Sequence, residues 1–162
     1  MRVGILSDTH NELTRTKRAV ELLLEEGAEY LIHCGDLAIP EIVHVCAELP
    51  FVFVFGNHDC DQVPELRRAA KETESLCLEW GGEVALAGRR IAVVHGHLTM
   101  DLKPLLAATP DYLLSGHTHE PCESYLGSTR RINPGALFRT ERFTVALLDL
   151  TQGGVRFITI DQ

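Results

Sequence analysis

Short apolar runs alternate with amphipathic stretches in the first third of the chain. The runs at residues 3–7, 30–34 and 51–55 have the length and the β-branched or aromatic composition of buried strands. Between them, residues 12–26 place apolar side chains on one helical face, and residues 40–48 predict a shorter helix with proline at its start. This β-α-β-α-β order predicts a parallel sheet that is covered by helices.

The rest of the chain follows a different pattern, because short strand-like runs succeed one another. Turns are predicted at Gly81-Gly82, Gly88-Arg89 and Gly153-Gly154. Strands are expected at residues 75–78, 83–87, 90–94, 112–114, 123–126, 130–132, 143–150 and 155–160. So many strands in one domain, residues 1–162, predict an α/β fold in which two sheets form a β-sandwich flanked by helices.

Composition narrows the class of protein. The hydrophobic share of 45% and the charged share of 23% are those of a globular domain. No apolar run approaches a membrane span, and the first residues lead into a strand, so neither a membrane partner nor a signal peptide is expected. The net charge of -8 argues against non-specific nucleic acid binding. Five cysteines without CxxC spacing predict reduced thiols and a cytoplasmic location.

Residues of the types that bind metals stand at the ends of the apolar runs. Strand ends at one edge of a sheet converge in space, so these side chains are expected to meet. Six of the eight histidines fall in four short motifs, which argues against chance; His33 and His44 are interpreted as ordinary core or surface residues. The candidate metal ligands are Asp8, His10, Asp36, Asn57, His95, His117 and His119.

Each motif has a plainer interpretation when it is taken alone. Asp8 and Asn11 have the side chains of helix caps, and Gly35-Asp36 is a common turn. Asn133-Pro134-Gly135 is a turn by composition, and a structural role alone is equally consistent with it. The motifs therefore carry weight as a set.

The sequence Gly56-Asn57-His58-Asp59 is more specific. Asn57 offers a neutral oxygen ligand, and His58 is a candidate proton donor. Asp59 is a candidate to hold the His58 ring in position, as carboxylates do for catalytic imidazoles. The alternative is an Asn-His turn that is stabilised by local hydrogen bonds.

Taken together, the ordered motifs resemble those of the calcineurin-like metallophosphoesterase superfamily. They are Asp-x-His, Gly-Asp, Gly-Asn-His-Asp, His-Gly-His, Gly-His-Thr-His and Asn-Pro-Gly, and the resemblance spans residues 3–149. The short length is similar to that of the small bacterial and archaeal phosphodiesterase branch, to which the retromer subunit of the same fold also belongs. The resemblance implies an αββα metallophosphoesterase fold with the site at the strand ends.

The resemblance also implies a binuclear metal centre. Carried over by motif, the first metal takes Asp8, His10, Asp36 and His119. The second metal takes Asp36, Asn57, His95 and His117, so that Asp36 bridges. His58 is then expected to contact the scissile phosphate and to assist the leaving group, with Asp59 as its support, while His97 is left without a fixed role.

Two positions depart from the pattern of the small branch. His58 stands where that branch often carries cysteine, and the histidine of the larger superfamily favours catalytic competence. Ala136 follows the Asn-Pro-Gly turn where serine is common, so no side-chain hydrogen bond is expected from it.

The sequence therefore predicts a binuclear metal-dependent phosphoesterase that hydrolyses small phosphodiesters by attack of a metal-bridging hydroxide. The mixed nitrogen and oxygen ligand set contains no thiolate, which suits two divalent ions of manganese first, or of iron, zinc, nickel or cobalt. One alternative is a phosphomonoesterase or nucleotide hydrolase with the same site. Another is a non-catalytic binding scaffold of the same fold.

The surroundings of the site are less defined. Loops at residues 60–74 and 98–110 are expected to form its wall, and Arg67, Arg68 and Lys103 are interpreted as solvated surface charges. Cys60 is either an oxidation-sensitive thiol beside the site or an inert one. Exposed sheet edges permit a homodimer.

Overall fold

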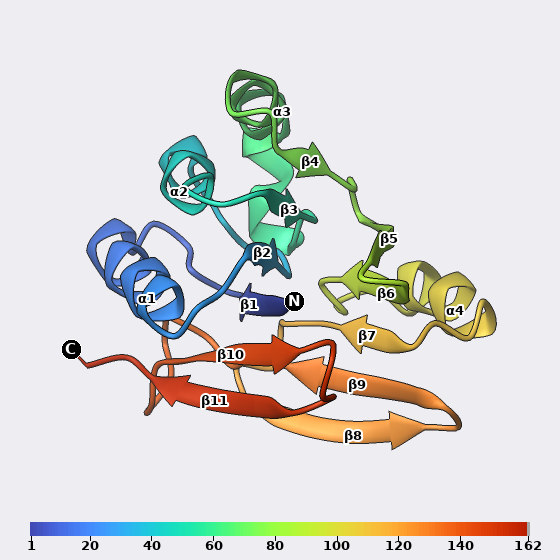
Figure 1. The fold of residues 1–162 in the computed structure, drawn as a ribbon. Helices are drawn as coiled ribbons and strands as arrows, with labels where there is room; N and C mark the ends of the chain where they lie inside the picture. The colour runs from blue at the N-terminus through green and yellow to red at the C-terminus, as the bar shows by residue number, and fades with distance from the viewer. Residues whose placement is uncertain (162) are drawn as a thin grey trace.

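The computed structural model describes residues 1–161, and two β-sheets pack face to face in it between outer helices (Figure 1). The first half contains β1 (Arg2–Leu6), α1 (Leu13–Glu25), β2 (Tyr30–His33), α2 (Pro40–Cys46), β3 (Phe51–Phe53), the 3-10 helix η1 (Asn57–Gln62), α3 (Val63–Glu72) and β4 (Leu76–Cys77). The second half contains β5 (Gly81–Leu86), β6 (Arg89–Val94), α4 (Thr99–Ala107), β7 (Tyr112–Leu114), β8 (Cys122–Leu126), β9 (Thr129–Asn133), β10 (Thr144–Asp149) and β11 (Val155–Thr159).

The strand order brings the candidate ligands to one edge of the sandwich. The first sheet has the order β11-β10-β1-β2-β3-β4, and the second has the order β5-β6-β7-β9-β8. β1, β2 and β3 run parallel, and so do β6, β7 and β9. The carboxyl ends of parallel neighbours lie at the same edge, where α/β sheets typically bind their ligands.

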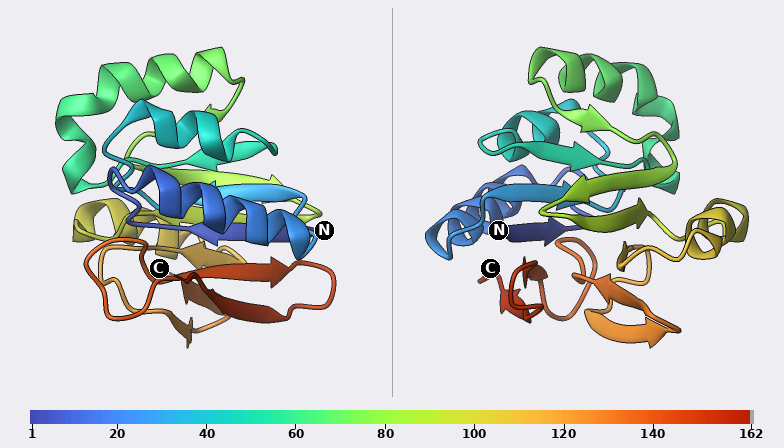
Figure 2. Two further views of the ribbon diagram at one scale, coloured as in Figure 1. Left: turned by 90° about the vertical axis from the view of Figure 1, so that its left-hand side faces the viewer. Right: turned by 45° about the vertical axis from the view of Figure 1, so that its right-hand side comes forward.

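Three apolar layers hold the sandwich together. α1, α2 and α3 cover the outer face of the first sheet, and α4 covers part of the outer face of the second (Figures 1 and 2). The helices contribute buried side chains to the first layer, among them Leu23, Ile42 and Leu66. The middle layer consists of side chains from both sheets, among them Ile5, Ile32, Val93, Leu114 and Ile132.

The αββα fold and all of the expected strands are confirmed, and so are the helices expected at residues 12–26 and 40–48. The prediction that residues 60–74 and 98–110 are loops is wrong, because they contain η1, α3 and α4. α3 buries only Leu66, Ala69 and Ala70, and α4 has no fully buried residue and contains Pro104. α3 therefore has few apolar residues to mark it among its charged ones, and α4 lacks a clear apolar face.

The prediction of a turn at Gly81-Gly82 is also wrong. Both glycines lie in β5, where they pair with Val94 and Val93 of β6. A Cβ at Gly82 would come within 3.2 Å of the Leu78 side chain, so glycine here permits close packing of the strand. No helix in residues 1–161 is both long and apolar enough to cross a membrane.

Candidate metal centre

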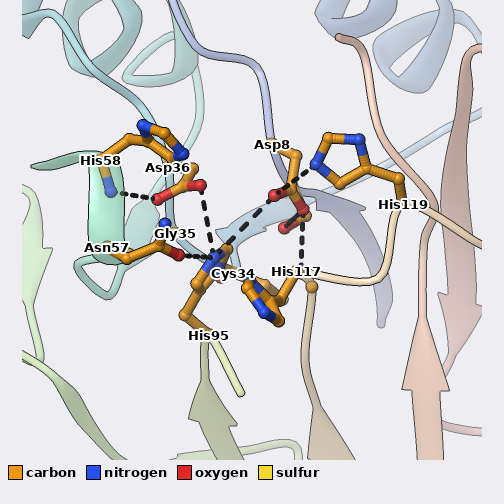
Figure 3. A network of polar contacts seen from close by, with 12 residues as sticks. Asp8, Cys34, Gly35, Asp36, Asn57, His58, His95, His117 and His119 are labelled. Atoms are coloured by element: carbon orange, nitrogen blue, oxygen red, sulfur yellow. Dashed lines mark hydrogen bonds and ion pairs between the residues drawn. The ribbon is translucent and has the colours of Figure 1, made fainter. Parts of the chain in front are cut away.

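Five strand-end loops bring the seven candidate ligands together, and Figure 3 labels all of them except His10. Asp8 and His10 follow β1, Asp36 follows β2, Asn57 opens η1 after β3, His95 follows β6, and His117 and His119 follow β7. Neighbouring loops of the second sheet are joined by a backbone hydrogen bond from the Gly116 N–H to the His95 carbonyl at 3.1 Å, and the His117 N–H joins the two sheets by donating to Asp8 Oδ2 at 3.0 Å. Residues more than 100 positions apart in sequence therefore share one site.

Two groups of side chains have the spacing of metal ligands. Ligand atoms of Asp8, His10 and His119 lie within 4.8 Å of one another, and so do those of Asp8, Asp36 and His95. Asp8 belongs to both groups, and its Oδ1 lies 3.2 Å from His119 Nε2 and 3.9 Å from His95 Nε2. The geometry thus places a carboxylate between two sets of imidazoles.

The remaining two candidates lie at the border of these groups. Asn57 Oδ1 lies 3.1 Å from His95 Nε2. The ring of His117 has its centroid 5.1 Å from that of His95, and its backbone N–H donates to Asp8 Oδ2 at 3.0 Å. Both side chains are exposed at the rim, so the site opens to solvent on their side.

Two histidines are oriented by hydrogen bonds from the ring nitrogen that faces away from the centre. His95 Nδ1 lies 2.8 Å from the Cys34 carbonyl oxygen, and His119 Nδ1 lies 3.3 Å from the Arg139 carbonyl oxygen. A carbonyl can only accept, so in each ring Nδ1 carries the hydrogen and Nε2 is left free. Metal-binding histidines typically have this arrangement, with the second nitrogen bonded to a carbonyl or carboxylate.

The hydrogen bonds of the Asp8 carboxylate show whether the site suits a cation. Its Oδ2 accepts hydrogen bonds from the Ser7 hydroxyl at 2.6 Å and from the His117 N–H. Its Oδ1 is buried and has no hydrogen-bond partner within residues 1–161. An unpaired carboxylate oxygen in a buried site is costly, and a bound cation removes that cost. The donor set therefore fits a divalent metal ion.

The charges in the centre depend on one another. Burial raises the pKa of Asp36, but the hydrogen bond and charge of His95 and the His58 N–H outweigh burial and lower it to about 2. Burial lowers the pKa of His95, but the hydrogen bond that the ring donates to the Asp36 carboxylate and the charges of Asp8 and Asp36 outweigh burial and raise it. Carboxylates that remain ionised make the centre attractive to cations.

The backbone at the centre is strained. Five of the seven candidate ligands have a positive φ, namely Asp8 (50°), His10 (47°), Asp36 (60°), His117 (68°) and His119 (61°). Positive φ is uncommon outside glycine and costs about 1–3 kcal/mol for each such residue. Strain of this kind is typical of functional sites, where the surrounding structure holds side chains in a required direction.

Two glycines allow the loops to approach closely. A Cβ at Gly116 would lie 1.8 Å from Ser7 Oγ, and a Cβ at Gly56 would lie 2.1 Å from Asp36 Oδ1. No side chain fits at either position without displacing a candidate ligand loop. The glycines of the Gly-His-Thr-His and Gly-Asn-His-Asp motifs are therefore explained by packing.

Asp59 has a different role from the one predicted. Its buried carboxylate accepts the backbone N–H groups of Asp36 at 2.9 Å, Ala38 at 2.7 Å and Gly56 at 2.7 Å. No hydrogen bond joins it to the His58 ring among the described residues, and that ring lies near His10 instead, with 4.9 Å between centroids. The prediction that Asp59 holds the His58 ring is corrected: Asp59 anchors the loop that carries Asp36.

Besides His58, three histidines are not candidate metal ligands, and each has a different environment. His33 is fully buried and neutral, since burial lowers its pKa to about 3; its Nδ1 accepts the Gly35 N–H and its Nε2 lies 2.9 Å from Thr9 Oγ1. His44 is exposed on α2. His97 lies beside the centre, 5.4 Å from His95 between ring centroids, and its buried Nδ1 has no partner within residues 1–161.

Asn133 is a supporting residue that sequence reasoning left undecided. Its Nδ2 donates to the Gly116 carbonyl at 2.9 Å and lies 3.0 Å from Thr118 Oγ1, and its Oδ1 accepts the Gly135 N–H. The Asn-Pro-Gly turn thus fixes the loop that carries His117 and His119. The sequence shows the turn, but it does not show the partners of the Asn133 side-chain amide, which lie 17 and 15 residues away along the chain.

The wall beside His119 also differs from the expectation. An open cavity of about 660 Å³ lies there, lined by Glu120, Pro121 and residues 139–142 rather than by the segments at 60–74 and 98–110. Phe138 packs on His10, with 4.2 Å between ring centroids.

Two further expectations from the sequence concern surface charges and a helix cap. Of the three basic residues expected to be solvated surface charges, Arg67 pairs with Glu79. The helix cap proposed as an alternative for Asp8 and Asn11 is absent within the described chain, since α1 has Glu12 at its N-cap.

Comparisons with known proteins agree with this geometry. The sequence model for the calcineurin-like phosphoesterase superfamily domain matches residues 1–153. Phosphodiesterase MJ0936 of Methanocaldococcus jannaschii is 29% identical over 99% of this chain and 100% of its own. Phosphodiesterase YfcE of Escherichia coli K12 is 26% identical over 85% of this chain and 79% of its own.

Solved structures of other proteins share the fold. The structure of an archaeal phosphodiesterase superimposes with a TM-score of 0.88 and 27% identity, over 99% of this chain and 100% of that one. Vps29 of Entamoeba histolytica, solved with zinc, superimposes with a TM-score of 0.61 over 99% of both chains. At 17% identity the second likeness concerns the fold alone.

Proposed function

The chain belongs to the calcineurin-like phosphoesterase superfamily, and from this premise we propose that it is a binuclear metal-dependent phosphodiesterase. Membership makes it a metal-dependent phosphoric ester hydrolase, in line with its phosphodiesterase relatives. The observation that carries the finer proposal is the pair of histidines, His95 and His119, whose free Nε2 atoms face the carboxylate of Asp8. The proposed substrate is a small phosphodiester.

The proposed ligand sets follow the motifs. Asp8, His10, Asp36 and His119 hold one ion, and Asp36, Asn57, His95 and His117 hold the other. The short distances from Asp36 Oδ2 to His10 Nε2 (3.7 Å) and to His95 Nε2 (3.4 Å) support Asp36 as the shared ligand. When bound, two such ions lower the pKa of a shared water, so that hydroxide can attack phosphorus, and offset phosphoryl charge.

The nitrogen-rich ligand set suits manganese, and iron, zinc, nickel and cobalt are the alternatives. Neither of the two ligand groups found in residues 1–161 contains a cysteine, and Cys34 contacts His95 through its carbonyl oxygen. Soft ions such as copper(I) are therefore disfavoured.

His58 is proposed to protonate the leaving oxygen. Its backbone N–H donates to Asp36 Oδ1 at 2.9 Å, which fixes its place beside the centre, and its side chain is exposed next to His10. A solvent-facing imidazole at this place can deliver a proton to a departing alkoxide. Asp59 contributes indirectly, because it anchors the Asp36 backbone.

A test uses purified protein that has been stripped of metal and then reloaded. Turnover of bis(p-nitrophenyl) phosphate is expected with Mn²⁺, is expected to stop on chelation, and is expected to exceed turnover of p-nitrophenyl phosphate. Faster monoester turnover would support the phosphomonoesterase alternative. No turnover of either ester with manganese, iron, zinc, nickel or cobalt would favour a binding scaffold.

A further inference from the structure

A second cavity lies behind the loop that carries His117 and His119, and both polar and apolar residues line it, with Leu102 and Ile132 among the apolar ones. It has a volume of about 210 Å³, and Ser115, Gly116, Thr118, Ser124 and Arg131 contribute to its lining. Arg131 pairs in register with Leu113, which packs under α4, whereas the next residue, Ile132, belongs to the layer between the sheets. Because side chains alternate along a strand, Arg131 lies on the outer face of the second sheet, away from the sandwich interior.

Arg131 has no partner in the part of the chain that the structure describes. Its Nε is buried without a hydrogen bond, and its guanidinium forms no ion pair within residues 1–161. Other arginines of this sheet are paired: Arg130 with Glu123, Arg90 with Glu83 and Arg89 with Asp111. A guanidinium that is partly removed from water and unpaired is unfavourable, which points to a missing anion.

The other groups around the cavity suit an anion as well. None of its lining residues is acidic, although the chain carries a net charge of -8. Ser115 and Ser124 contribute hydroxyls. The Thr118 hydroxyl receives the Asn133 amide at 3.0 Å, so its own hydrogen is free to donate. Hydroxyls beside a planar guanidinium fork are a common arrangement for binding oxyanions.

We propose that this cavity binds a phosphate group. About 30 Å³ is the share of one liquid water, so about 210 Å³ is room for a tetrahedral oxyanion together with a few waters. The site is separate from the metal centre, since Gly116 and Thr118 line it while His117 between them faces the other way, toward His95. The proposal therefore holds whether or not the metal centre hydrolyses phosphodiesters.

The test is titration of inorganic phosphate by calorimetry into the metal-loaded protein and into the same protein after chelation. Phosphate that binds to metals is lost on chelation, and phosphate in the cavity is retained. Arg131→Gln is expected to weaken the retained binding roughly ten- to hundredfold, the range for one hydrogen-bonded charge. Arg130→Gln is the matched control: it removes the same charge one residue away, and the retained binding is expected to stay within about twofold of that of the unmodified protein.

A second variant keeps the test decisive if Arg131→Gln does not fold. Ser124 lies directly across from Arg131 in the β8–β9 pair, so Ser124→Asp places a carboxylate where the anion is proposed. This variant is expected to lose phosphate binding without loss of thermal stability, because the new ion pair replaces the ligand. Phosphate binding equal to that of the unmodified protein in Arg131→Gln or in Ser124→Asp would overturn the proposal. So would the absence of binding in the chelated unmodified protein.

Discussion

The two sides of the loop at residues 116–119 carry opposite charge. On one side, Asp8 and Asp36 stand among histidines; on the other, Arg131 stands among hydroxyls and no lining residue is acidic. Each side has a buried polar atom without a partner in residues 1–161, Asp8 Oδ1 on the first and Arg131 Nε on the second. Unpaired groups of opposite sign indicate ligands of opposite sign, a cation in front of the loop and an anion behind it.

The two sides also differ in how they are built. The cation side uses strained backbone, with positive φ at five candidate ligands, and holds its rings through carbonyl groups. On the anion side, Arg131 and Ser124 occupy ordinary strand positions, and Arg131 is only partly buried. Strain and burial restrict a site to one geometry, so we expect the cation to bind more tightly and more selectively than the anion.

The largest expected effect is the loss of metal binding on the cation side. Asp36→Asn removes the proposed shared ligand and is expected to weaken metal binding by roughly 10²-fold or more, because even residues that merely support ligands contribute about 10–100-fold. Metal content after dialysis and calorimetric titration measure the change. Asp61→Asn, which removes an exposed carboxylate nearby, is the control and should retain metal. Phosphate binding in the chelated Asp36→Asn protein should be unchanged, and a parallel loss there would erase the distinction between the two sides.

The next effect concerns chemistry without metal loss. His58→Ala is expected to lower kcat for the diester by roughly 10²-fold while metal content stays the same, since a general acid typically contributes 10²–10⁴-fold. His44→Ala removes an exposed histidine elsewhere and serves as the control. A His58→Ala enzyme with full kcat would show that the leaving group needs no help from this residue.

A smaller effect, on the free energy of unfolding, is expected when a larger residue at position 116 displaces the loop at residues 116–119. Gly116→Ala places a methyl group against Ser7 Oγ and Asp8, so the loop or Asp8 must shift. Overpacking of this kind typically costs about 1–3 kcal/mol of unfolding free energy. Urea unfolding of the chelated protein measures that cost, and Gly154→Ala, where nothing lies within 4 Å, is the control. Equal stability of the two variants would contradict the close approach described for residue 116.

An effect of similar size on stability is expected from the Asn133 side chain, which holds the loop that both sites share. Asn133→Ala leaves the buried Gly116 carbonyl without its amide donor and is expected to cost about 1–3 kcal/mol of unfolding free energy. Because the loop contributes to both sites, metal affinity and phosphate affinity should fall together by a small factor. Thr118→Val removes only one of the two contacts and should have a weaker effect. A change in only one affinity would show that the two sides are fixed independently.

Most of the fold was predictable because local periodicity encodes it. The alternation of apolar runs and amphipathic stretches predicted β1 to β3 with α1 and α2, and the later strand pattern predicted both hairpins near the C-terminus. α3 and α4 were missed because each packs through few apolar residues, and Pro104 weakens the helical signal further. Gly81 and Gly82 were misjudged because glycine in a strand and glycine in a turn look the same in sequence.

At the site, the residue types were predictable and their partners were not. Strand-end position alone was enough to predict that the seven candidate ligands meet. The contacts of Asp59 with the Asp36, Ala38 and Gly56 backbone depend on how two loops dock, which no spacing rule encodes. Arg131 was missed for the same reason: in sequence it is one of two adjacent arginines, and only the sheet register separates the paired one from the unpaired one.

The carboxylate of Asp59 has a consequence for motion as well as for geometry. It binds amide hydrogens from the loop after β2 and from the loop after β3, beyond the point where these strands pair, so those hydrogens are released when the contacts between the two loops open. In hydrogen–deuterium exchange, the amides of Asp36, Ala38 and Gly56 should therefore exchange slowly and with a common opening free energy, like a small cooperative unit. The ligand loops are then ordered before any ion arrives, and ion binding need not bear the entropy of assembling them.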